Sequence, residues 1–124
     1  MDFNQHRPIY LQMVDFFCEQ ILAKKWKNGT KIPSIRAISA ELEVNPNTAI
    51  RAFNFLQEKE IIYNKRGIGY FVSENGAEKT KIYKKNVFIE KQLPLFFKQL
   101  DLLDINIAEL ADFYQKNKKN TSND

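Results

Sequence analysis

The sequence predicts a mostly α-helical fold with one small β-hairpin. Three observations lead to this prediction. First, apolar residues recur with helical spacing in three successive segments between residues 9 and 58. Second, two short β-prone runs follow, and a basic segment that contains glycine separates them. Third, helical spacing returns after residue 85. This order is that of a winged helix-turn-helix followed by a two-helix tail. We place the winged domain at residues 1–75 and the tail at residues 76–124.

Length and composition exclude several classes of function. A chain of 124 residues can bury one modest core but not a large catalytic cavity. With one cysteine and one histidine, the chain can form neither an intrachain disulfide nor a Cys/His zinc cluster, and it has no P-loop motif. We therefore expect that the protein is not an enzyme and uses no metal or other cofactor.

Charge and hydropathy bear on partners and location. The net charge of +4 and the pI of about 9.1 favour an anionic partner. No window approaches the roughly 18 uninterrupted apolar residues of a membrane span, and the N-terminus lacks the apolar core of a signal peptide. The sequence thus predicts a cytoplasmic protein without a membrane partner.

The first helix is predicted from Ile9 to Trp26, because its apolar residues recur on one face. Cys18 lies on that face, where a buried structural thiol is the usual interpretation. Asn28-Gly29 interrupts the pattern. Lys31-Ile32-Pro33 is too short for more than an edge strand or an extended link.

Two further helices are predicted from their capping residues. Ser34 is the expected N-cap of a short second helix that carries apolar residues at Ile35, Ile38 and Leu42. Asn45 followed by a proline at the first helical position begins the third helix. Its apolar face is formed by Ala49, Ala52, Phe53 and Leu56.

A hairpin and a boundary follow the third helix. Ile61-Ile62-Tyr63 and Tyr70-Phe71-Val72 are the predicted strands, and a basic turn that contains glycine joins them. The polar segment Ser73 to Lys81 is interpreted as the domain boundary, with the second module beginning near Thr80.

The tail is predicted to form two helices. Pro94 lies inside the first repeat and predicts a kink, because proline removes a backbone donor. Asn106 and Glu109 form a capping-box pattern that opens the last helix. The polar end from Lys116 to Asp124 is expected to fray.

The surface of the predicted winged domain suits double-stranded DNA. Asn47, Arg51 and Asn54 recur on a face of the third helix that the core does not need, and modest polar side chains fit a major groove about 12 Å wide. The helix start is a natural phosphate seat. Lys65-Arg66-Gly67 can follow the backbone or enter the minor groove. Each feature alone is more typical of a solvated surface, and only their order and spacing favour DNA.

Several motifs carry a resemblance to a known family. Pro33-Ser34-Ile35-Arg36, Val44-Asn45-Pro46-Asn47-Thr48 and the segment from Arg66 to Val72 resemble the GntR family of bacterial regulators, as does the opening from Pro8 to Gln12. The tail is similar in length and pattern to the YtrA subfamily, whose members carry a short helical dimerisation tail instead of a large effector domain.

The resemblance implies roles for individual positions. Arg36 matches an arginine that contacts DNA, at a guanine edge. Two positions depart from the family pattern: Glu43 stands in a turn where glycine is common, and Ile50 lies near the DNA-facing side, where it contacts a thymine methyl group or simply packs. Pattern and resemblance together give the predicted DNA-binding residues Ser34, Arg36, Asn45, Asn47, Thr48, Arg51, Asn54, Lys65, Arg66, Gly67 and Gly69.

The apolar face of the tail predicts a homodimer. Two amphipathic helices make a poor core alone and must bury their apolar faces somewhere. Either the two helices only cover each other, or they pair two copies of the chain. Pairing of two copies is the simpler solution. A two-fold dimer would set two recognition helices roughly 34 Å apart and predicts an inverted-repeat operator. The predicted interface comprises Ile89, Leu93, Phe96, Phe97, Leu100, Leu103, Ile107, Leu110, Phe113 and Tyr114.

The predicted function is that of a sequence-specific DNA-binding transcription regulator, and the resembling subfamily often represses. The alternative is a winged helix that contacts protein or RNA without operator specificity. The tail is too short to enclose a pocket within one chain, so an unidentified small-molecule effector is left open only for a cleft between domains or across a dimer.

Overall fold

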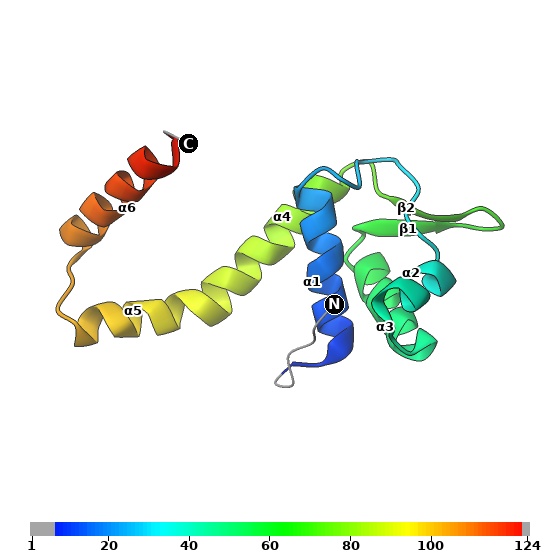
Figure 1. Cartoon of the computed structure of the whole chain (residues 1–124), viewed down its shortest axis with the longest axis horizontal. Coiled ribbons are helices and arrows are strands. Elements are labelled where there is room, and N and C mark those ends of the chain that lie inside the picture. The colour runs from blue at the N-terminus through cyan, green and yellow to red at the C-terminus, as the bar shows by residue number, and fades with distance from the viewer. Residues whose placement is uncertain (1–6, 123–124) are drawn as a thin grey trace. The chain divides into compact units, whose positions relative to one another are not determined.

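The computed structural model describes residues 7–122 and confirms the predicted order of elements (Figure 1). The winged domain consists of α1 (Ile9–Leu22), α2 (Ile35–Leu42), α3 (Pro46–Glu58), β1 (Ile62–Lys65) and β2 (Gly69–Val72). The chain continues with α4 (Gly76–Val87), the π-helical segment η1 (Phe88–Gln92), α5 (Leu93–Leu102) and α6 (Ile107–Ser122). The fold is therefore mostly helical with a two-stranded wing.

The core of the winged domain lies between α1, α2, α3 and the hairpin. Phe17 of α1 and Phe53 of α3 meet at its centre, edge to face, with ring centroids 5.1 Å apart. The four predicted apolar residues of α3 are all buried. Cys18 is also buried, and burial raises the pKa of its thiol to about 12. The thiol therefore stays protonated at neutral pH, which suits a packing role.

The first helix is shorter than predicted. It ends at Leu22 because Lys24 adopts a left-handed backbone conformation with φ of 62°. The amides of Lys25 and Trp26 both donate to the carbonyl of Gln20, which closes the helix end. Apolar spacing alone did not reveal this stop.

The predicted caps of α2 and α3 are both present. The Ser34 hydroxyl accepts a hydrogen bond of 3.0 Å from the Ala37 amide. The Asn45 side chain accepts one of 2.8 Å from the Asn47 amide, and Pro46 occupies the first helical position. Both helices thus begin where their capping residues predict.

Glu43 forms the turn between α2 and α3 in a left-handed conformation, with φ of 54° and ψ of 49°. At this position, members of the family that the sequence resembles often have glycine. The turn therefore keeps the geometry that glycine favours, although an L residue with a side chain occupies it at a conformational cost of about 1–2 kcal/mol.

Replacing Glu43 with glycine is expected to raise the free energy of unfolding by about 0.5–1 kcal/mol. The substitution removes the left-handed penalty, and the greater freedom of glycine in the unfolded chain offsets part of that gain. Urea denaturation measures the difference. Glu41→Gly is the control, because it removes the same charge from the interior of α2 and should destabilise by about 0.5–1 kcal/mol. A loss of stability in both variants would contradict the strain at Glu43.

The wing is an antiparallel hairpin whose register runs from Ile62 opposite Val72 to Lys65 opposite Gly69. The predicted extended link joins it as a short third segment. The Ile32 amide donates to the Tyr70 carbonyl at 3.0 Å, and the Val72 amide donates to the Thr30 carbonyl at 2.9 Å. The hairpin is thereby fixed to the connection between α1 and α2.

The polar segment from Ser73 to Lys81, which was interpreted as the domain boundary, contains the start of α4 at Gly76. A Cβ at Gly76 would lie 2.5 Å from a methyl carbon of Val72, so glycine allows the helix to approach the hairpin closely. Thr80 is buried, and its hydroxyl donates to the Gly76 carbonyl. The first compact unit accordingly extends to Lys84, beyond the expected boundary at residue 75.

The second compact unit begins at Lys85. The distortion predicted at Pro94 takes the form of the π-helical segment η1 immediately before α5, because proline cannot donate to the carbonyl one turn earlier. The predicted capping box opens α6: the Glu109 amide donates to the Asn106 side chain at 2.8 Å, and the Asn106 amide donates to the Glu109 carboxylate at 3.4 Å.

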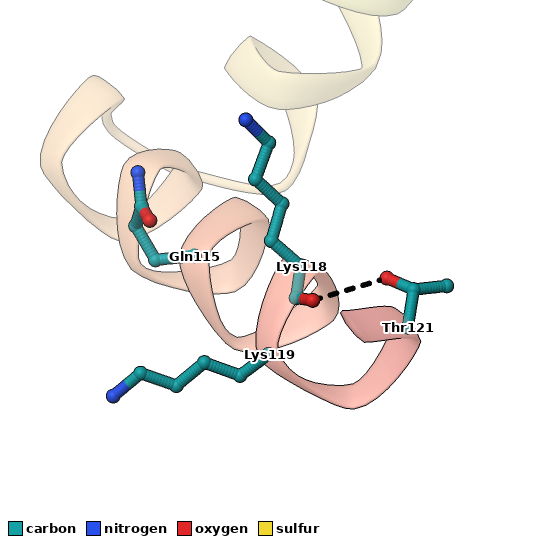
Figure 2. A pocket seen from close by; sticks show the side chains of 4 residues that line it. All are labelled: Gln115, Lys118, Lys119 and Thr121. Carbon is teal, nitrogen blue, oxygen red and sulfur yellow. Dashed lines mark hydrogen bonds between the residues drawn. The ribbon is translucent and has the colours of Figure 1, made fainter. Parts of the chain in front are cut away.

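The end of α6 differs from the expectation of a frayed polar segment, because the helix continues to Ser122. In the last turn the Thr121 hydroxyl donates to the carbonyls of Asn117 and Lys118, and Figure 2 shows the second of these hydrogen bonds. The open depression in Figure 2 is lined by four residues of this one helix. It has no converging polar groups from another element and is not a candidate site.

Candidate nucleic-acid interface

The exposed face of α3 carries the predicted polar residues. Asn47, Arg51 and Asn54 are exposed, whereas Thr48 is half-buried. The opposite side of the helix is the buried apolar face described above. We call Asn47, Arg51 and Asn54 the recognition face. The sequence therefore predicted correctly which side of α3 is free to bind a partner.

The first backbone amides of α3 are not free to bind a phosphate, as follows from their hydrogen bonds. Pro46 has no amide hydrogen, the Asn47 amide donates to the Asn45 side chain, and the Thr48 amide donates to the Asn45 carbonyl. The partial positive charge of the helix end and the polar side chains remain available there. An anion at the start of α3 would therefore be attracted by the partial positive charge of the helix end and by polar side chains, and not by free backbone amides.

Arg36 lies in the first turn of α2 and is exposed. It lines a groove of about 530 Å³, together with Val44 and Pro46, which precede and begin α3. The fold thus places Arg36 beside the start of the recognition face, although the two are separated in sequence. Ser34 precedes this turn and remains exposed, with its hydroxyl oxygen engaged as the N-cap.

Ile50 is 40% exposed, so part of its side chain packs against the domain and part is open to solvent. It lies between the polar residues of α3 and gives this surface an apolar patch. Contact with a thymine methyl group stays a prediction.

The wing tip is basic and projects away from the helices (Figure 1). Lys65, Arg66 and Gly67 are exposed, and the Ile68 amide donates to the Lys65 carbonyl to close the turn. Gly67 has φ of 79°, and no atom lies within 4 Å of a Cβ placed there. Glycine is therefore required by the backbone conformation, while the open space permits close approach of a partner.

One contact at this surface was missed by the sequence analysis. The Arg51 guanidinium carbon lies 4.2 Å from the centre of the Tyr10 ring. Tyr10 follows the apolar spacing of α1, is half-buried and packs against the core. No pattern within either helix reveals a pair that forms only when the two helices pack together.

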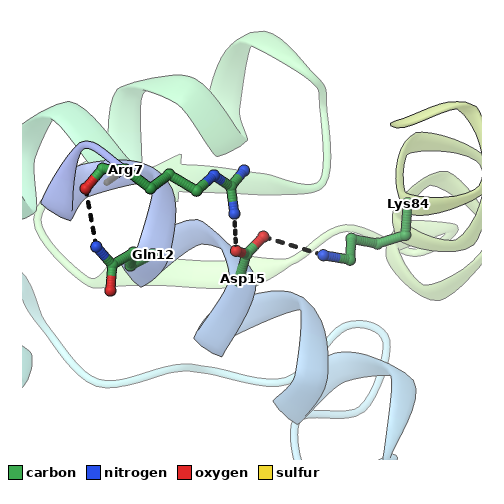
Figure 3. A network of polar contacts seen from close by, with 4 residues as sticks. All are labelled: Arg7, Gln12, Asp15 and Lys84. Carbon is green, nitrogen blue, oxygen red and sulfur yellow. Dashed lines mark hydrogen bonds and ion pairs between the residues drawn. The ribbon is translucent and has the colours of Figure 1, made fainter. Parts of the chain in front are cut away.

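A second group of charges ties α4 to α1 (Figure 3). The Asp15 carboxylate forms ion pairs with Arg7 and, at 3.0 Å, with Lys84. The Gln12 side chain donates to the Arg7 carbonyl at 2.8 Å. Arg7 and Lys84 are thus already paired within the first compact unit, whereas Arg36, Lys65 and Arg66 are exposed.

The described range, residues 7–122, has no group of His, Cys, Asp or Glu that could hold a metal ion. None of its helices is long and apolar enough to cross a bilayer.

The chain resembles proteins of one family in sequence. Residues 10–72 match the family model described as bacterial regulatory proteins of the gntR family. The HTH-type transcriptional repressor YtrA of Bacillus subtilis is 36% identical over 94% of this chain and 88% of its own length. The HTH-type regulator YhcF of the same organism is 29% identical over 89% of each chain.

Solved structures agree with this likeness. A regulator of the GntR family from Bacteroides thetaiotaomicron has a TM-score of 0.79 and 37% identity, and the match covers 91% of this chain and 98% of that one. A GntR family regulator from Listeria monocytogenes has a TM-score of 0.76 and 31% identity, with 92% and 98% covered. These relatives are transcription regulators and not enzymes. The chain therefore belongs to the gntR family of bacterial regulatory proteins.

Proposed function

We propose that this regulator binds an inverted-repeat DNA operator as a homodimer and represses the genes beside it. The observation that carries the proposal is the exposed polar recognition face of α3 with Arg36 beside its start. A helix in the major groove meets base edges that differ in hydrogen-bonding pattern, and arginine and asparagine match those patterns. In this proposal the regulator acts in the cytoplasm of a bacterium, where it meets the DNA.

Each part of the winged domain has a separate role in this proposal. Asn47, Thr48 and Asn54 meet base edges or the adjoining backbone, and Arg36 donates two hydrogen bonds to a guanine. Asn45 positions the start of α3 through its cap. The wing carries Lys65 and Arg66 to the phosphates or the adjacent minor groove, with Gly67 and Gly69 shaping the turn.

The tail supports the proposed dimer. Most of its predicted interface residues are exposed in the single chain, including Leu103 at 69% and Ile107 at 70%. Leu100 is the exception, since it is buried within the protomer, and Leu93 and Leu110 are half-buried. So much exposed apolar surface on two helices favours a partner, and a second copy is the partner always present.

Repression is supported by one relative. YtrA of Bacillus subtilis, with 36% identity over nearly the whole chain, is described as a transcriptional repressor. A bound repressor acts by occupying DNA that the transcription machinery needs. No observation favours a particular small-molecule effector, and we propose none.

Selection from a random pool of DNA duplexes tests the proposed function. The purified full chain should enrich an inverted repeat, and sedimentation at micromolar concentration should show a dimer. A sedimentation profile of monomer alone would contradict the dimer. Failure to enrich any duplex, with binding to RNA or to a protein instead, would favour the alternative winged-helix role.

The wing is expected to act on all sequences alike. Lys65→Ala should weaken binding to every duplex by a similar factor and lower the slope of log K against log salt by about 1 for each half-site, because one phosphate contact is lost. Lys98→Ala is the control, since it removes the same charge from the tail. Fluorescence anisotropy at four salt concentrations measures both. A loss confined to one base position would contradict a phosphate role.

A further inference from the structure

The contact between Arg51 and Tyr10 joins two helices at the edge of the recognition face. Tyr10 lies in the first turn of α1, and Arg51 lies in the second turn of α3. The guanidinium carbon is 4.2 Å from the ring centre, which is the geometry of a cation–π contact. A guanidinium held against an aromatic ring keeps N–H groups that can still donate hydrogen bonds.

The Tyr10 ring is itself held in place. Phe55, one helical turn after Arg51, packs edge-on against it with centroids 6.4 Å apart. Phe55 in turn packs against Tyr83 of α4 at 5.5 Å. Tyr83 is half-buried, and this burial raises the pKa of its hydroxyl. The Tyr10 ring that contacts Arg51 is thus held in place by packing against Phe55.

Arg51 is exposed. It lines an open hollow of about 260 Å³ together with Tyr10, Asn54, Phe55 and Glu58. Arg51 forms no ion pair with any residue that the structure describes. An exposed arginine that is held against an aromatic ring is arranged to receive an anion.

We propose that Tyr10 is a positioning residue for DNA binding, which holds the Arg51 guanidinium so that its N–H edge donates to a DNA phosphate. The proposal rests on the proposed function. The contact holds the guanidinium against α1, at the border of the recognition face, and in this proposal that border meets the DNA backbone. A side chain already fixed in the free protein loses less conformational freedom on binding.

A double-mutant cycle tests this coupling. Tyr10→Leu removes the ring and is expected to weaken binding of the selected operator about two- to fivefold in the presence of Arg51. The same substitution is expected to have no effect in an Arg51→Ala background. Arg51→Ala alone should lower the salt slope by about 0.9 for each half-site. Tyr10→Phe keeps the ring and is the matched control, with binding expected to stay unchanged.

Several results would overturn the proposal. An equal loss from Tyr10→Leu with and without Arg51 would show that Tyr10 acts only through stability. A Tyr10→Phe loss as large as that of Tyr10→Leu would assign the effect to the hydroxyl. An unchanged salt slope in Arg51→Ala would exclude the phosphate.

A second measurement does not depend on DNA or on the folding of Tyr10→Leu. In the wild type and in Tyr10→Phe, NMR should show the Arg51 side-chain protons shifted upfield by the ring current, and ordinary shifts would overturn the proposal. If these shifts are present but the wild type binds no duplex, the proposed function fails instead, and the positioning role in DNA binding fails with it.

Discussion

The double substitution Leu103→Glu with Ile107→Glu is expected to convert the dimer to a monomer and to weaken operator binding about 10²- to 10⁴-fold. Both side chains are about 70% exposed in the single chain, so the charges should not disturb the fold of the protomer. In a dimer they would be desolvated beside apolar groups, which is costly. Binding would then lose the high effective concentration of the second half-site.

Sedimentation and anisotropy test this result on the same samples. Lys98→Gln is the control, because it lowers the net charge by one at an exposed polar position of α5 without placing a charge on the apolar surface. Binding to a single half-site should be the same for the variant and the wild type, since the winged domain is unchanged. A variant that stays dimeric and keeps its operator affinity would show that the tail surface near residues 103–107 pairs with nothing.

The winged domain could be predicted in detail because its signals are local. Asn45 followed by Pro46 accounts for both the position and the cap of α3, and Ser34 does the same for α2. Alternation between an apolar and a polar side of α3 then fixes which side chains are exposed. The family model matches this same part of the chain, from residue 10 to 72.

What the sequence did not reveal depends on contacts between distant segments. The polar start of α4 was interpreted as a domain boundary, and only the close approach of Gly76 to Val72 and the burial of Thr80 show that this segment belongs to the first compact unit. The left-handed Glu43 violates the preference of its residue type, so its conformation is imposed by the turn between two packed helices. Tyr10 beneath Arg51 is a third case of the same kind.

Arg36→Ala is expected to lower the preference for one base pair in each half-site by about 1–3 kcal/mol. Arg36 lies in the first turn of α2, is exposed, and borders the groove that leads to the start of α3. From there a guanidinium can donate to two acceptors of one guanine, whereas alanine donates to none. Because the side chain is not part of the core, stability should change by less than about 0.5 kcal/mol.

Competition between the selected operator and its single-base variants measures this preference. Arg36→Lys provides the sharper control, since it keeps the charge but loses the planar fork that binds guanine at two points. The salt slope should therefore be retained with lysine while the base preference falls. If Arg36→Ala weakens all duplexes equally and lowers the salt slope, Arg36 contacts a phosphate, and sequence recognition must come from the recognition face of α3 alone.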